Sequence, residues 1–238
     1  MWLVVRRELR SAFGSPIGYV VAVVFLAVTG WLLFSTFFLN GRADLRAFFE
    51  LLPITLALVA PAITMRQLSE ELSSGTYESV LTLPLSAAQI LGGKFVASLL
   101  FVMIVLVPTL LYPLSIASVV GGSAATQLDW GPVVGGYIGA ILLAGLYCAI
   151  GLLASSASRN QIVAFILAIA VCAFLALVDR MLFIIPAPLV GLIQFLSATS
   201  HFESVARGVL DTRDLVYFVS FGGAALFGAH AVMQVRRG

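Results

Sequence analysis

Charged residues are scarce in this sequence, and their scarcity excludes a soluble fold. Only 10% of its 238 residues are charged, whereas 61% are hydrophobic, and the mean hydropathy is +1.10. A soluble domain contains about 45 to 50% apolar residues, so a soluble core could not bury this much apolar surface. We therefore expect an all-α integral membrane protein that forms a single transmembrane domain over residues 1–238.

Cysteine and histidine are also rare, with two residues of each. Cys148 and Cys172 lie in apolar runs, where we expect small packing side chains rather than a disulfide or a metal site. His201 and His230 are distant in sequence from each other and from the cysteines, so no metal-ligand spacing is present. No nucleophile and base stand together either. We expect neither catalytic residues nor metal ligands.

The phosphate-binding motif G-x-x-x-x-G-K-[ST] is missing. The nearest string, "QILGGKF", lacks the first glycine at the required spacing and the hydroxyl that would bind magnesium. Any energy from ATP must therefore come from another chain. The net charge of +2 is too small and too scattered to indicate nucleic-acid binding. We expect a non-enzymatic chain that binds no cofactor itself.

Long apolar runs are what the sequence does contain. Residues 17–39 would form a helix of about 35 Å, which crosses a hydrocarbon core of about 30 Å with some tilt. The second run holds Pro53 and Pro61, and it reaches the required length if its helix begins near Ala47. The six predicted spans cover residues 17–39, 47–65, 95–118, 133–154, 162–178 and 215–235.

A seventh apolar run, Met181–Leu196, is the one rival to this count. Pro186 and Pro188 interrupt it, and neither half is long enough to cross a bilayer. We interpret it as a re-entrant or surface hairpin on the outer side. With the charged tail that follows, it predicts an outer lid over Met181–Asp214, with the alternative that this segment merely closes the fold. The charged lid residues are Arg207, Asp211 and Asp214.

The basic residues indicate the orientation. Six spans place both termini on one side, and cytoplasmic loops carry the excess of lysine and arginine. The side that holds the termini has eight basic residues and the opposite side has five. We therefore expect both termini in the cytoplasm, with the chain in a bacterial inner membrane. The eight are Arg6, Arg7, Arg10, Arg66, Lys94, Arg159, Arg236 and Arg237, and the five are Arg42, Arg46, Arg180, Arg207 and Arg213.

The N-terminal residues predict a basic amphipathic helix at the inner membrane surface. Gly14 and Pro16 end its pattern before the first span. A simple retention signal next to the membrane is the alternative reading of these residues. The apolar face consists of Trp2, Val5, Leu9 and Phe13, and the basic face of Arg6, Arg7 and Arg10.

The most polar passage, Met65–Ser86, lies between the second and third spans. Four charged side chains in lipid would cost on the order of 10 kcal/mol, so the passage must leave the bilayer. Gly75 suits a helix stop, Thr76 can cap a second short helix, and Ser86 and Gln89 form a capping box. We expect two short surface helices around a glycine corner, with exposed carboxylates, although an ordinary solvated loop is the alternative.

Small residues recur at every fourth position in three spans. Such ridges allow helix backbones to approach closely in lipid. Packing within one subunit is the preferred interpretation, and a seam between two subunits is the alternative. The ridges are Gly131, Gly135 and Gly139; Ala164, Ala168, Cys172 and Ala176; and Ser220, Ala224 and Gly228.

The order "R..SEE...GT.E.....P" after the second span, with the basic N-terminal helix and six spans, resembles permease subunits of ABC-2 type exporters. The tail "HFESVARGVLDTRDLVYF" further resembles the gliding-motility-associated branch, which is related to the permease of nitrous-oxide-reductase maturation. The resemblance implies a coupling helix seated in a groove of a separate ATPase, which binds ATP and magnesium. The implied interface residues are Arg66, Glu70, Glu71, Gly75, Thr76 and Glu78.

The family resemblance implies two permease and two ATPase subunits, and it favours an exporter, as a homodimer. Apart from Glu50, which we expect at the membrane interface, the spans hold no charged residue, which suits a lipid-like, amphipathic or large sugar-bearing cargo. The alternative is a membrane scaffold that passes ATPase-driven motion to an additional membrane or periplasmic partner. A secondary transporter is a weaker hypothesis, because no ionisable site is visible at mid-membrane.

Overall fold

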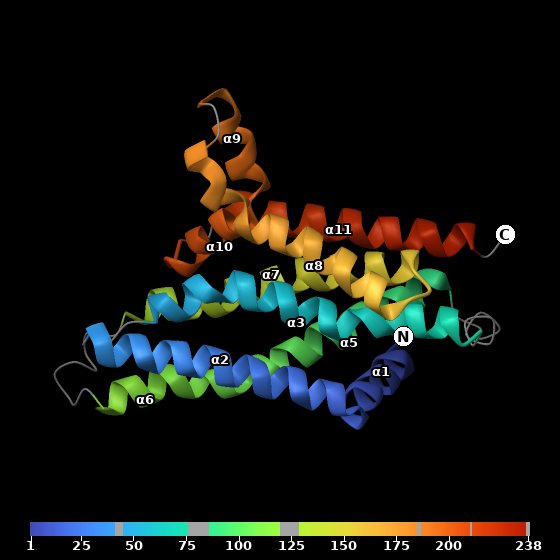
Figure 1. The fold of residues 1–238 in the computed structure, drawn as a ribbon, viewed down its shortest axis with the longest axis horizontal. Helices are drawn as coiled ribbons and strands as arrows, with labels where there is room; N and C mark the ends of the chain where they lie inside the picture. Colours follow the sequence, from blue (N-terminus) through green and yellow to red (C-terminus); the bar gives the residue numbers. More distant parts are fainter. Residues whose placement is uncertain (41–44, 76–85, 120–128, 185–186, 210, 237–238) are drawn as a thin grey trace.

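The computed structural model describes residues 1–40, 45–75, 86–119, 129–184, 187–209 and 211–236. The regular elements in these ranges are helices, and the long ones run side by side in one bundle (Figure 1). Six helical stretches of the described chain are long and apolar enough to cross a membrane, which confirms the predicted number of spans. They comprise α2 (Pro16–Asn40), α3 (Arg46–Ser73), α5 (Ala87–Leu106) with η1 (Val107–Leu110) and α6 (Leu111–Val119), α7 (Trp130–Ala157), α8 (Gln161–Leu177) with the start of η3 (Val178–Ile184), and α11 (Thr212–Val235).

Helix α7 lies at the centre of the bundle and packs against α3, α8 and α11. In its most apolar stretch 72% of the residues are buried, compared with 17% in α2 and 17% in α11. Tyr147 and Leu143 of α7 are completely buried in the core. Helices α2 and α11 therefore leave most of their surface for lipid or another chain.

Glycines of α7 allow its neighbours to approach closely. A Cβ atom at Gly151 would lie 2.9 Å from the Cβ of Thr64 in α3, closer than real side chains come. At Gly139 it would lie 3.1 Å from the ring of Phe202, in the short helix α10 (Ala198–Ala206). The ridges on α7 and α8 thus pack within the subunit, as preferred, whereas Ser220 and Ala224 of α11 are exposed.

Helix α3 is longer than the predicted second span. It runs without interruption to Ser73, so a separate short helix after Met65 is wrong. The chain holds no glycine or proline between Pro61 and Gly75, and nothing local ends the helix. Its 28 residues measure about 42 Å, which exceeds the hydrocarbon core of about 30 Å.

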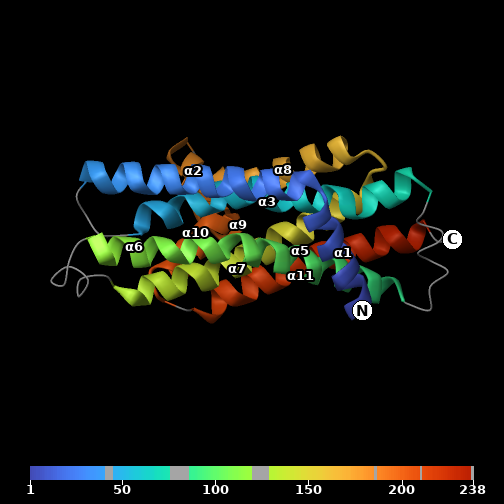
Figure 2. The same cartoon turned by 90° about the horizontal axis from the view of Figure 1, so that it is seen from below.

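The N-terminal helix α1 (Trp2–Gly14) ends at the predicted glycine and crosses α5 transversely (Figure 2). Val5 is buried, and Leu9 and Phe13 pack against the core. Trp2, by contrast, is 70% exposed, so it does not share that buried face within this chain. Both termini lie at the same end of the bundle (Figure 1). The membrane-surface position of α1 stays a prediction.

Short helices precede α11. Helices η3, α9 (Ala187–Leu196) and α10 follow the fifth span, and η3 and α9 project sideways from the bundle (Figure 1). Pro188 lies in the first turn of α9, where a proline is tolerated, while Pro186 falls outside the described residues. The expected short helices are present on either side of residues 185–186, and their re-entrant or surface position is untested.

Candidate functional site

The end of α3 and the start of α5 border the predicted coupling segment. Gly75 has a φ of +71°, a left-handed conformation that favours glycine, directly after the helix ends. Ser86 and Gln89 form the predicted capping box, which starts α5. Thr76 and Glu78 lie outside the described residues, as does the predicted second short helix.

A serine of α7 holds the last turns of α3. The Ser155 hydroxyl accepts hydrogen bonds from the backbone N–H groups of Leu68 and Ser69, each at 3.1 Å. It also donates to the backbone oxygen of Met65 at 2.9 Å. Because Ser155 is completely buried, these bonds attach the polar end of α3 to the central helix.

Lys94 of α5 is the centre of an ionic cluster that joins three helices. Its side chain is 0% exposed, and its ammonium donates to Glu8 Oε1 at 3.0 Å and Glu71 Oε1 at 2.8 Å. The third acceptor is the backbone oxygen of Gln67, at 2.6 Å. All three N–H donors therefore have partners, from α1 and α3. The sequence placed Lys94 only among the cytoplasmic basic residues and did not single out Glu8.

Arg7 completes this cluster from α1. Its Nη2 lies 2.7 Å from Glu71 Oε1 and 3.0 Å from Glu8 Oε1. Burial alone would lower the pKa of Arg7, but hydrogen bonds and charges from Glu8 and Glu71 raise it above its usual value. The guanidinium therefore stays charged at physiological pH, and the cluster balances two cations, Arg7 and Lys94, against two carboxylates.

Glu71 is not the exposed carboxylate that its sequence position suggested. Its side chain is 14% exposed and is held by Arg7 and Lys94. Glu70, by contrast, is 49% exposed, and its ion-pair partner Arg66 is 31% exposed and also donates from Nη1 to Ser15 Oγ at 2.9 Å. In the sequence, Glu70 and Glu71 are equally polar and cannot be distinguished. On the helix, neighbouring side chains point in different directions, and only that of Glu70 points away from the bundle.

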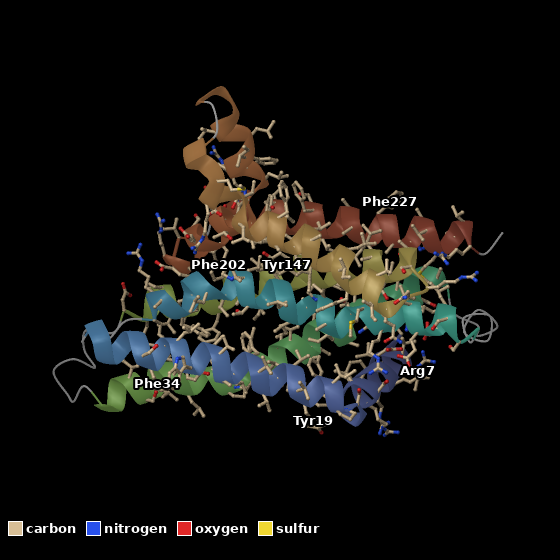
Figure 3. The ribbon with its side chains drawn as sticks, viewed as in Figure 1. Arg7, Tyr19, Phe34, Tyr147, Phe202 and Phe227 are labelled. Atoms are coloured by element: carbon tan, nitrogen blue, oxygen red, sulfur yellow. The ribbon has the colours of Figure 1, made fainter. Side chains whose placement is uncertain are left out.

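The basic face of α1 is partly free of the bundle. Arg6 and Arg10 are exposed on α1, while Arg7 faces the cluster. Figure 3 shows Arg7 at the end of the bundle that carries the termini, with Phe34 near the opposite end. Exposed charges are thus present at the terminal end, as they are at the other end in the Arg46–Glu50 and Arg207–Glu203 pairs.

The predicted lid residues have separate roles at the other end. Arg207 pairs with Glu203 at 3.3 Å on the surface. Asp211 caps α11 by accepting from the N–H of Arg213 at 2.9 Å. Asp214 is buried and lies 2.7 Å from Nδ1 of His201, so this histidine is not isolated in space.

His201 links three short or terminal elements. Its ring stacks on Tyr217 of α11 with centroids 4.1 Å apart, and its Nε2 lies 3.2 Å from the backbone oxygen of Phe195 in α9. The contacts of His201 could not be predicted from the sequence, because a single histidine forms no periodic pattern that would indicate its neighbours.

Within the described residues, no group of three histidine, cysteine, aspartate or glutamate side chains could hold a metal ion. Cys148 and Cys172 are buried free thiols in the core, which agrees with their expected packing role. The terminal end instead offers a rigid, charged surface built on helices.

Comparison with known proteins identifies the family of this chain. The family described as ABC-2 family transporter protein matches residues 4–233. No curated protein sequence matches the chain. The matched region includes five spans completely, the sixth span as far as Met233, the ionic cluster and the short helices before α11. This chain therefore belongs to the ABC-2 family of transporter membrane proteins.

Proposed function

We propose that this ABC-2 membrane protein is the permease subunit of an exporter, and that the polar end of α3 receives the motion of a partner ATPase. The Lys94 cluster is the observation that supports this role. It joins α1, α3 and α5 directly beside the exposed Arg66–Glu70 pair. A displacement of the end of α3 would move three helices together, because the buried ammonium bonds to two of them from the third.

The interface residues then divide into two roles. Glu70 and Arg66 are the proposed contacts with the ATPase, since both are accessible. Glu71 transmits the motion inward through Lys94. Gly75 sets the corner at which the chain leaves α3, and Thr76 and Glu78 belong to the proposed contact segment that follows.

The assembly is proposed as two permease and two ATPase subunits, with ATP and magnesium on the ATPases. The low burial of α2 and α11 supports a second permease copy or a further membrane or periplasmic partner. Export, the gliding-motility-associated branch and the bacterial inner membrane are proposals that rest on the sequence motifs. A lipid-like or sugar-bearing cargo suits the apolar spans.

At the other end, we propose that Met181–Asp214 acts as an outer lid. The His201–Asp214 pair and the contact with Phe195 hold α9 and α10 against α11. A lid must change its accessibility during the ATP cycle, and Arg207 is an exposed reporter position on it.

The coupling proposal is tested with Glu70→Ala in a reconstituted complex. We expect ATPase binding to weaken about tenfold, the order of magnitude of one interfacial charge contact. Glu50→Ala is the matched control, because Arg46–Glu50 is an i,i+4 pair on the same helix, at 2.9 Å, near its other end. Binding affinity and substrate-stimulated hydrolysis are the measurements.

Equal binding by both variants and the parent, in an intact complex, would show that α3 does not contact the ATPase there. Normal coupling with no cargo movement would favour the alternative, a scaffold that transmits force to an outer partner.

A further inference from the structure

A cleft of about 630 Å³ opens between α1, α2, α3 and α5 at the end that carries the termini. Charged side chains of α1 and α3, including Arg7 and Glu71, line one part of it. Apolar residues of the spans, Val21, Ile63 and Phe101, line the part nearer the middle of the bundle. The cleft thus joins a polar region to a region at hydrocarbon depth.

Two hydrogen-bond acceptors in this cleft are buried without a partner. They are Gln67 Oε1 and Glu71 Oε2, one turn apart on α3, and both residues line the cleft. Neither side chain can turn away without losing bonds. Gln67 Nε2 donates to Ser98 at 2.8 Å, and Glu71 Oε1 accepts from Arg7 and Lys94. A buried acceptor without a hydrogen bond lowers the stability of the fold. A ligand that offers N–H or O–H donors would remove this penalty, so such a ligand fits here.

The charges around the cleft are balanced. Two cations and three carboxylates line the cleft, and the buried Lys94, which pairs with two of these carboxylates, brings the sum to 3 − 3 = 0 and favours a ligand without net charge. Arg7 Nη2 lies 2.7 Å from one oxygen of Glu71, while the other oxygen of the same carboxylate is buried without a hydrogen-bond partner. A cation and an unpartnered acceptor are therefore adjacent, which suits a zwitterion. The six residues are Arg7, Arg66, Lys94, Glu8, Glu70 and Glu71.

We propose that the cleft binds one phospholipid of the surrounding bilayer, whose headgroup carries a phosphate and a protonated primary amine. The ammonium donates to Gln67 Oε1 and Glu71 Oε2, and the phosphate lies against Arg7. An acyl chain lies along Val21, Ile63 and Phe101, which belong to the spans. This lipid site goes beyond the proposed coupling function and does not depend on it.

Headgroup preference tests the site. The purified full chain in detergent is mixed with equal amounts of ethanolamine, choline and glycerol phospholipids of identical acyl chains, and bound lipid is counted by native mass spectrometry. Choline has a quaternary nitrogen without N–H donors, and the glycerol lipid is anionic. We expect ethanolamine lipid to be retained about tenfold over choline lipid, the size of one charge-assisted hydrogen bond.

Two variants locate the binding. Ala62→Trp fills the cleft from α3, and Gln67→Leu removes one unpartnered acceptor. Each variant should abolish the tenfold preference for ethanolamine lipid. Leu58→Trp is the matched control, because Leu58 lies one turn away on α3, is 53% exposed and does not line the cleft. It should keep the preference. Circular dichroism melting shows whether each variant is folded. If Ala62→Trp does not fold, the headgroup preference of Gln67→Leu is the deciding measurement.

Equal retention of ethanolamine and choline lipids by the parent would overturn the proposal, because the two unpartnered acceptors would then not select the headgroup. An unchanged preference in folded Ala62→Trp or Gln67→Leu would also overturn it. Because no ATPase is present, neither result bears on the coupling proposal.

Discussion

A lysine that is buried between helices keeps its charge only when every N–H donor has an acceptor. Lys94 meets this condition through Glu8, Glu71 and the backbone of Gln67. Each carboxylate oxygen that it contacts is shared with Arg7. The four side chains therefore act as one unit, and the loss of any member leaves a buried charge unmatched.

Replacement of Lys94 by methionine should lower the free energy of unfolding by about 3 to 5 kcal/mol, because Glu8 and Glu71 lose their buried counter-charge. Denaturation in mixed micelles measures it. Arg207→Met is the control, since its ion pair with Glu203 is exposed and contributes less than about 1 kcal/mol. Equal losses in the two variants would mean that the cluster does not stabilise the junction of α1, α3 and α5.

At the level of the elements, contact between α3 and α7 depends on a missing side chain at Gly151. Gly151→Ala places a Cβ against Thr64, whose hydroxyl already donates to Ala60 at 2.8 Å. We expect a loss of about 1 to 3 kcal/mol from overpacking. Gly145→Ala on the same helix meets only Phe95 at 3.9 Å and should be neutral or stabilising. Chemical denaturation of both variants makes the comparison, and equal stability would contradict the proposed close approach.

The spans could be predicted because lipid fixes the length of an apolar helix. Helix ends were predictable where local chemistry specifies them, as at Gly14, Gly75 and the Ser86–Gln89 box. The end of α3 was misplaced for a physical reason. Polarity shows where a chain leaves lipid, but a helix without a breaker can continue into water.

The ionic cluster could not be predicted in the same way. Glu8 and Lys94 are 86 residues apart, so their pairing depends on how α1 crosses α5 rather than on any local pattern. The His201–Asp214 pair lies closer in sequence, yet a turn between two helices brings it together. The coupling role of Glu71 stays a prediction, but its expected exposure was wrong, because burial of this side chain depends on the neighbouring helices.

For the whole molecule, α7 connects the two ends of the bundle. Ser155 near its C-terminus holds the end of α3, and Gly135 and Gly139 near its N-terminus lie against α10. Because α7 is one helix of 28 residues in the buried centre, it would connect a shift at the end of α3 with a shift at the short helix α10. This arrangement supports the proposed communication between a partner ATPase at one end and a lid at the other.

Orientation and lid movement can be measured together with single cysteines, since the native Cys148 and Cys172 are buried. We expect Ser74→Cys to react with an impermeant thiol reagent only from the cytoplasmic side, and Arg207→Cys only from outside, because three spans, an odd number, lie between the two positions. Reaction of both from one side contradicts this topology.

With the ATPase bound, ATP should change the labelling rate of Arg207→Cys severalfold while a cysteine at exposed Trp130, on α7 at the same end, keeps its rate. Rates that respond equally, or not at all, would leave Met181–Asp214 as a fixed cover of the fold, because a lid that gates export must move relative to the central helix.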